Sequence, residues 1–336
     1  MAASELQTAW DILEKAPTGT GIDTRTLYAS RSPLDLCAAL RPDGTRMFIF
    51  ACDLQSAAGL KLPPSSEGLE IKRLQDNEFK QKCTVGISLR NIRYRELFDA
   101  VIEDVCLRAL STSLELEAFK IVLARIADWQ KFFSEAAAEG LSEERRRGLY
   151  GELSFLRRLI SCGLLEQTVL QVWTGPSNAD QDYQFRKGAV EVKVSLSAQN
   201  QQLVISSERQ LDTRGFQVFF VYHLSLAVKK QTGETLNAIV DSLRSLLSIE
   251  QQLVFTDLLF EYGYLDTQRA FYDEDGYVVR ESNYFEVREG FPRITEELTR
   301  TIPGVGKVKY CIDVPYCSNF KVSEDQAMKA LRGLYD

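Results

Sequence analysis

The segment DYQFRKGAVEVKVS, residues 182–195, limits the possible folds more than any other stretch of this chain. Three valines alternate with Glu191 and Lys193, and this period of two predicts a β-strand with one apolar face. Lys187 and Gly188 precede the strand and predict the two-residue turn of a hairpin. The segment therefore predicts two adjacent antiparallel strands.

The predicted turn places Asp182 opposite Lys193. Because cross-strand partners share a face, we expect Asp182, Glu191 and Lys193 to project from the same side of the hairpin. A turn of another length would shift this register. The alternative interpretation is a solvated strand face with a cross-strand ion pair, worth about 0.2–1 kcal/mol.

The 336 residues exceed the usual size of one domain, and the sequence pattern changes near residue 138. Residues 24–93 alternate as in β structure, and two helices are predicted from Arg95 onward. The small-residue stretch EAAAEG then ends this part of the chain. We expect a β-rich N-terminal domain with two helices over 1–138, for recognition or docking, and a second domain over 139–336.

The second domain is predicted to be α/β (or α+β), with helices flanking a mixed sheet. A helix is expected from about Glu143 to Cys162, a strand around 168–173, and a helix beginning in SERQLD, residues 207–212. The apolar run FQVFFVYHLSLAV, residues 216–228, predicts a buried strand. Further helices and strands alternate to the end of the chain.

Composition excludes several classes of function. The net charge of −7 argues against a molecule that binds nucleic acid by its overall charge. Seven cysteines without CxxC spacing and a single histidine make a zinc site improbable. The polar start resembles no secretion signal, and no apolar run approaches the length of a membrane span. We expect a cytoplasmic protein with reduced thiols and no membrane association.

Two carboxylates a few ångströms apart, such as Asp182 and Glu191, repel each other and raise each other's pKa. A bound divalent cation relieves this repulsion, and hard oxygen ligands suit Mg²⁺. A neighbouring lysine, Lys193, could orient an attacking water or offset charge that develops on a phosphate. This set of groups is typical of a site that hydrolyses phosphodiester bonds.

The order Asp182, eight intervening residues, then Glu191-Val192-Lys193 resembles the signature of the PD-(D/E)XK nucleases, which have a restriction-endonuclease-like fold. The proline that usually precedes the aspartate is replaced by Gln181. The whole-chain layout is most similar to uncharacterised PD-(D/E)XK proteins of bacterial restriction and defence loci. The core resemblance covers about residues 141–226.

The resemblance implies a Mg²⁺-dependent DNA endonuclease in a restriction-type anti-phage system, with Mn²⁺ as a possible substitute. Asp182, Glu191 and the main-chain carbonyl of Val192 would hold the metal, and Lys193 would orient or activate the water. The family core begins with a helix that carries an acid, a place that Glu152 fits, and Gln210 would support the lysine or a phosphate. For Glu152 the alternative is a capping role or an ion pair with an arginine such as Arg145, and for Gln210 it is a structural hydrogen bond.

Duplex DNA is the expected substrate, with phosphate contacts from Arg145, Arg157 and Lys187. A helicase-like or MORC-type ATPase of the same system, or a second copy of the chain in a homodimer, is an expected partner. Two alternatives stay open at this point. One is a catalytically silent PD-(D/E)XK scaffold that binds DNA or an ATPase, and the other is an RNA-processing nuclease of the same fold.

Overall fold

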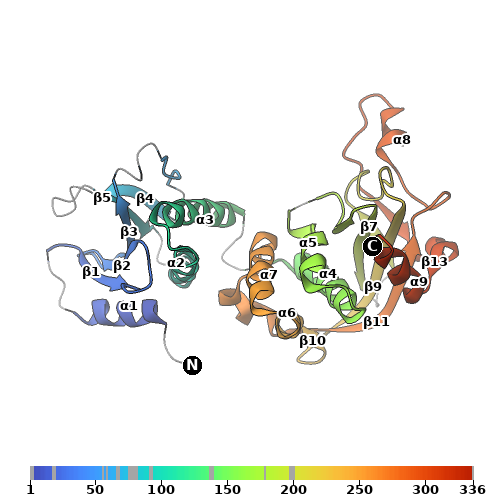
Figure 1. Cartoon of the computed structure of the whole chain (residues 1–336). Helices are drawn as coiled ribbons and strands as arrows, with labels where there is room; N and C mark the ends of the chain where they lie inside the picture. Colours follow the sequence, from blue (N-terminus) through green and yellow to red (C-terminus); the bar gives the residue numbers. More distant parts are fainter. Residues whose placement is uncertain are drawn as a thin grey trace. The chain divides into compact units, whose positions relative to one another are not determined.

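The computed structural model describes residues 4–16, 20–54, 57, 60–65, 69–74, 82–90, 94–135, 140–177, 179–196 and 201–334. The chain forms two compact units, Met1–Ala138 and Glu139–Asp336 (Figure 1). The division falls at the boundary expected from the sequence, although residues 136–139 of that boundary lie outside the described ranges. Within these ranges every helix is too short or too polar to cross a bilayer.

Where the structure describes it, the first unit contains an antiparallel five-stranded sheet in the order β1-β2-β3-β5-β4 and three α-helices. Phe50 of β3 packs on Phe119 of α3, with ring centroids 5.3 Å apart. Arg46 of β3 is 5% exposed and lies over the ring of Trp10 in α1. The elements are α1 (Glu5–Lys15), β1 (Asp23–Leu27), β2 (Asp35–Leu40), β3 (Arg46–Asp53), β4 (Leu69–Leu74), β5 (Lys82–Leu89), α2 (Arg95–Ala109) and α3 (Glu115–Glu135).

The second unit is built on a mixed sheet in the order β10-β11-β9-β7-β6, with β13 paired to β11. β7 runs parallel to β9, whereas β6 and β11 are antiparallel to their neighbours. Its strands are β6 (Tyr183–Phe185), β7 (Gly188–Leu196), β8 (Gln202–Ile205), β9 (Val218–Lys230), β10 (Glu234–Thr235), β11 (Asp275–Glu286), β12 (Tyr310–Asp313) and β13 (Lys321–Val322). The predicted α/β class with a helix-flanked mixed sheet is confirmed.

Helices cover one face of this sheet, the face that carries Val190 and Val192 of β7. The α-helices of this unit are α4 (Glu143–Ser161), α5 (Glu166–Val172), α6 (Leu236–Leu246), α7 (Ile249–Tyr262), α8 (Glu296–Arg300) and α9 (Glu324–Arg332). Its short 3-10 turns, which lie on either face, are η2 (Gly175–Ser177), η3 (Asp266–Tyr272) and η4 (Val314–Phe320). Of these, α8 lies away from the sheet (Figure 1). A Cβ at Gly151 of α4 would lie 2.4 Å from Val194 Cγ2, so only glycine lets this helix approach β7 so closely.

The opposite face of the sheet carries Ala189, Glu191 and Lys193 of β7, because side chains alternate along a strand. A second apolar core lies there, formed in part by the antiparallel pair β8–β12 and by η4. The two charged residues of β7 thus share a face with this second core. They stand on the side opposite the helix layer.

Two predicted elements are wrong. Residues 168–173 belong to α5 and its C-cap rather than to a strand, because Val169, Leu170 and Trp173 follow helical spacing and are all buried. Residues 207–212 form turns rather than a helix. There the Ser207 hydroxyl accepts the Arg209 N–H at 3.3 Å and Asp212 Oδ1 accepts the Arg214 N–H at 3.0 Å, and such local side-chain bonds to the backbone compete with helix formation.

Candidate active site

The hairpin exists, but its register differs from the prediction by two residues. Phe185 pairs with Gly188, and the two residues between them form the turn. One place beyond the last pair of this ladder, Asp182 comes opposite Glu191 rather than Lys193. A shift of two leaves every side chain on its predicted face, because strand side chains alternate with a period of two.

Lys193 is held by two partners on this face. Its Nζ lies 2.7 Å from Glu191 Oε1 and donates a hydrogen bond of 3.1 Å to Gln210 Oε1. The same oxygen of Gln210 accepts the main-chain N–H of Ser206 at 2.8 Å. Only 12% of the Lys193 side chain is exposed, so the ammonium group has a defined position at the edge of solvent.

Asp182 approaches the open edge of β7. Its Oδ2 accepts the main-chain N–H of Val192 at 2.7 Å, and its own carbonyl accepts the N–H groups of Thr174 and Gly175 at 2.8 and 3.0 Å. The N–H and C=O groups of one strand residue point to the same side. The Val192 carbonyl therefore faces the edge at which the Asp182 carboxylate lies.

Glu152 of α4 is buried beside the aspartate. Trp173 Nε1 donates a hydrogen bond of 2.7 Å to its Oε2, and the Tyr262 hydroxyl also bonds the carboxyl group. A Cβ at Gly175 would lie only 2.1 Å from Glu152 Oε2, so a residue without a side chain makes room for this carboxyl. The alternative of an ion pair with Arg145 is wrong, because that arginine bonds the Tyr262 carbonyl.

We expect Gly175→Ala to lower the free energy of unfolding by about 1–3 kcal/mol, since the added methyl overlaps a carboxyl group fixed by Trp173 and Tyr262. Urea unfolding measures this effect. Gly306→Ala is the matched control, because a Cβ there meets nothing within 4 Å. Equal stability of the two variants would contradict the close contact at Glu152.

Burial raises the pKa of three neighbouring acids. Burial raises the pKa of Glu191 to about 8, and the charge of Asp182 adds to this effect, although Lys193 opposes it. Burial, followed by the charge of Asp182, raises the pKa of Glu152 well above its usual range. Burial also raises the pKa of Asp182, against the opposing effect of Lys193 and of the Val192 N–H. The cluster thus concentrates carboxyl groups that resist ionisation in the absence of a cation.

These groups fit a hard divalent cation. Glu191 is 1% exposed, and its Oε2 has no hydrogen-bond partner among the described residues. Nowhere in the described part of the chain do three or more His, Cys, Asp or Glu side chains form a metal-binding group. The available donors are therefore two carboxylates, Asp182 and Glu191, and the Val192 carbonyl, with Glu152 behind them. Carboxylate and carbonyl oxygens are the ligands that Mg²⁺ prefers.

Comparison with models of known protein families gives a match. Residues 6–315 match the model described as "Putative PD-(D/E)XK family member, (DUF4420)". The chain belongs to this PD-(D/E)XK family. No curated protein and no solved structure matches it. The family resemblance predicted from Asp182, Glu191 and Lys193 is thereby confirmed.

Gln181 replaces the proline of the PD-(D/E)XK signature and has a structural role here. Its side chain is 5% exposed, and Nε2 donates to the Arg209 carbonyl at 3.0 Å. Its Oε1 accepts from Gln184 Nε2 at 3.0 Å. Gln181 therefore ties the acid-bearing end of the hairpin to the segment that carries Gln210.

The basic residues predicted to contact DNA differ in their surroundings. Arg145 bonds the Tyr262 carbonyl and lies over the Tyr262 ring, and Arg157 forms two hydrogen bonds with Glu234, at 2.5 and 2.8 Å. These contacts favour structural roles for both arginines. Lys187, in the β6–β7 turn, is exposed, and its side chain has no partner in the described ranges.

The sequence analysis missed the residues that surround Glu152. Trp173 and Tyr262 donate to its carboxyl group, and the Tyr183 hydroxyl donates to its main-chain carbonyl at 2.7 Å. Two of these aromatic residues lie close in the sequence to other residues of the site, and this proximity could have indicated them. Trp173 comes two residues before Gly175, and Tyr183 directly follows Asp182.

The raised pKa of Glu191 predicts pH-dependent metal binding. A proton must leave the carboxyl before its oxygen can bind a cation, so the affinity for Mg²⁺ should fall as the pH drops below about 8. Loss of one proton corresponds to about a tenfold change per pH unit. Calorimetric titration with Mg²⁺ and Mn²⁺ between pH 6 and 9 tests this, and an affinity that does not change over this range would refute it.

Proposed function

We propose that the chain is a Mg²⁺-dependent endonuclease that hydrolyses phosphodiester bonds in DNA, in a restriction-type defence system. The observation that carries the proposal is the buried Glu191, paired with Lys193 and facing Asp182, with one carboxylate oxygen free of protein partners. A scaffold has no need of such a group, because an unpartnered buried carboxylate destabilises the fold.

Each residue of the set has a distinct task in this proposal. Asp182, Glu191 and the Val192 carbonyl would hold the cation. When bound, Mg²⁺ supplies positive charge for the phosphate oxygens and lowers the pKa of a bound water. Lys193, positioned by Glu191 and Gln210, would donate a hydrogen bond to the attacking water or to the phosphate.

Glu152 and Gln210 would influence the reaction indirectly, through the residues that they contact. Glu152, fixed by Trp173, would add negative charge behind the two metal-binding carboxylates. Gln210 uses a single oxygen for both Lys193 and the Ser206 N–H, which fixes the lysine relative to the backbone. Both are positioning residues, and Gln210→Leu should therefore shift the pH profile of cleavage more than the affinity for DNA.

The test is cleavage of modified and unmodified duplex DNA by the purified chain, with Mg²⁺, with Mn²⁺ and with a chelator. Metal-dependent cuts that disappear in the Glu191→Gln variant support the proposal. An RNA substrate in parallel distinguishes the alternative nuclease. Tight DNA binding without cleavage of any substrate under any metal condition would identify a silent scaffold instead.

We expect the isolated chain to bind DNA weakly. Residues 141–210, which contain the site, carry nine Lys and Arg against eight Asp and Glu, and several of these arginines have intramolecular partners. Each neutralised phosphate contributes about −0.9 to the slope of log K against log salt. A salt titration of duplex binding should therefore give a slope shallower than about −5. Nanomolar affinity at physiological salt would contradict this expectation.

Weak binding by one chain implies that other molecules supply the remaining contacts. We include in the proposal a helicase-like or MORC-type ATPase partner, or a second copy of the chain in a homodimer, in a cytoplasmic complex. The first unit, residues 1–138, has none of the proposed catalytic residues and is the natural candidate for docking or recognition. Co-expression of the chain with a helicase-like or MORC-type ATPase, followed by co-purification and a cleavage assay, tests this part.

A further inference from the structure

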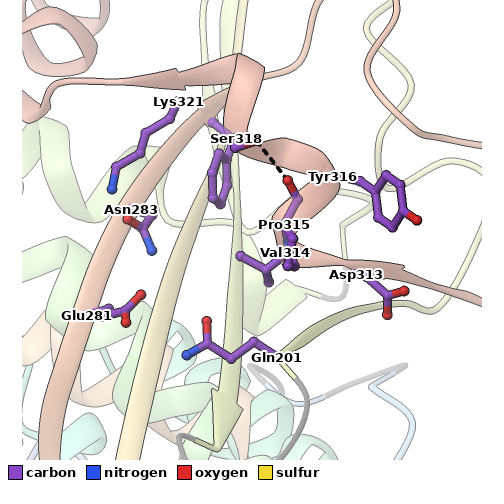
Figure 2. A pocket seen from close by; sticks show the side chains of 10 residues that line it. Gln201, Glu281, Asn283, Asp313, Val314, Pro315, Tyr316, Ser318 and Lys321 are labelled. Carbon is purple, nitrogen blue, oxygen red and sulfur yellow. Dashed lines mark hydrogen bonds between the residues drawn. The ribbon is translucent and has the colours of Figure 1, made fainter.

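A cavity of about 610 Å³ opens on the same face of the sheet as Lys193. Figure 2 shows Glu281, Asn283 and Lys321 along one wall, Val314 and Pro315 on the other, and Gln201 below them. The first wall is strand β11 with the start of β13, and the second is the turn η4. The cavity therefore combines a polar wall with an apolar one.

The polar wall carries groups without partners. Asn283 is 6% exposed, yet its side-chain amide forms no hydrogen bond with any described residue. Within the same ranges, Glu281 and Lys321 likewise form no hydrogen bond or ion pair. The Asn283 amide faces the cavity and has no partner in the described part of the chain, so it is available to hydrogen-bond a ligand there.

The cavity is connected to the proposed active site by one row of the sheet. Lys193 of β7 pairs with His223 of β9, and His223 pairs with Asn283 of β11. Neighbouring strands lie about 4.8 Å apart, so Asn283 lies roughly 10 Å from Lys193 along this row. This distance corresponds to about three nucleotides of a stacked strand, at 3.4 Å each, or to fewer nucleotides of an extended strand.

The charged side chains that line the cavity limit the chemistry of its ligand. Glu281 and Asp313 contribute two carboxylates, and Lys321 contributes one ammonium group. This excess of negative charge disfavours a phosphate inside the cavity. Carboxylates and amide oxygens accept hydrogen bonds from the exocyclic amino groups of bases, and an amide side chain can also donate to a ring nitrogen. The flat apolar wall of Val314 and Pro315 suits the face of a heterocycle.

We propose that this cavity receives one unstacked base of the substrate, close to the phosphate that is cut, and prefers bases with an exocyclic amino group over thymine. The proposal rests on the nuclease function proposed above and adds a point of base recognition to it. Enzymes that act on nucleic acids read extruded bases in this way, by hydrogen bonds to one edge and contact with the faces. Asn283 and Glu281 read the edge, and Lys321 lies at the rim where the backbone of the same nucleotide would pass.

The experiment measures binding without metal, so that it does not depend on cleavage. Fluorescence anisotropy follows the full-length chain, in a chelator, with a short oligothymidylate and with the same oligomer containing one central adenine, cytosine or guanine. At least one substituted oligomer should bind about fivefold more tightly or better. Glu281→Leu and Asn283→Leu, which remove the side-chain acceptor oxygens, should abolish this difference and leave the affinity for oligothymidylate unchanged.

Glu281 is exposed, so its variant retains the fold even if Asn283→Leu does not. Glu250→Leu, a substitution of the same kind at an exposed position on α7, is the control and should keep the preference. Equal binding of all four oligomers by the unaltered chain would overturn the proposal. So would a preference that survives Glu281→Leu, or saturation of the cavity by an arginine-containing peptide with no effect on oligomer binding. A chain that shows the base preference but cuts nothing would retain this inference and refute the nuclease function.

Discussion

The Glu191→Gln variant should lose Mg²⁺-dependent cleavage by about a thousandfold or more while it keeps its fold and its affinity for DNA. Gln has nearly the same shape as Glu but cannot provide the charged oxygen that a cation requires. We expect Oε2 of Glu191 to bind the cation, because it has no partner among the described residues, whereas Oε1 already contacts Lys193 Nζ. Single-turnover cleavage and equilibrium DNA binding measure the two effects separately.

The same substitution should also change how the free energy of unfolding depends on pH. The folded-state pKa of Glu191 is about 8, above the ordinary value of 4.5, so folding is favoured below pH 4.5 by this group and the advantage is lost as the pH rises toward 8. Between these values the free energy of unfolding of the unaltered chain should fall relative to that of Glu191→Gln, by at most about 1.4 kcal/mol per pH unit. Urea unfolding at several pH values gives this difference.

Glu250→Gln serves as the control for both measurements, because Glu250 is exposed in the first turn of α7. It should cut, bind and unfold like the unaltered chain. Wild-type cleavage by Glu191→Gln would show that the metal site is elsewhere. Loss of folding in Glu191→Gln would show that the carboxylate has a structural role.

Lys193→Met should reduce cleavage by about a hundredfold to ten-thousandfold, the range of a lost acid-base or electrostatic group. Methionine keeps the aliphatic length but removes the ammonium that contacts Glu191 and Gln210. Because this ammonium lowers the pKa of Glu191, its removal should raise that pKa further. Mg²⁺ affinity at neutral pH should therefore also fall and should recover at higher pH.

Measurement of cleavage and of Mg²⁺ affinity across pH separates the two effects of Lys193. If metal affinity recovers at high pH but cleavage does not, the lysine acts in the reaction itself. Full recovery of both would mean that Lys193 only assists ionisation of Glu191, which would contradict the proposed role. Lys229→Met, at the exposed end of β9, is the control for loss of a positive charge.

The sequence alone determined the local features with strong periodic signals. The alternation of valines with Glu191 and Lys193 predicted β7, and the apolar run of residues 216–228 predicted β9. The signature acids and lysine also indicated the PD-(D/E)XK family, which the family model confirms. These features depend on neighbours in the chain, whose spacing is visible in the sequence.

Predictions that depended on weak local preference were wrong. The β-branched residues in 168–173 suggested a strand, but contacts with α4 and α7 made the segment a helix. The segment 207–212, expected as a helix, forms turns in which the side chains of Ser207 and Asp212 bond nearby main-chain N–H groups. Tertiary contacts override local preference when they satisfy more buried groups than the local structure can.

Only the tertiary structure decided how the site is assembled. The hairpin turn set Asp182 opposite Glu191, and folding brought Trp173, Tyr262 and Gly175 around Glu152. It also buried Glu191 with one unpartnered oxygen and raised its pKa, whereas it tied Arg145 and Arg157 to other parts of the chain. Burial and electrostatic coupling depend on every group packed around a side chain, and most of these groups are distant in the sequence.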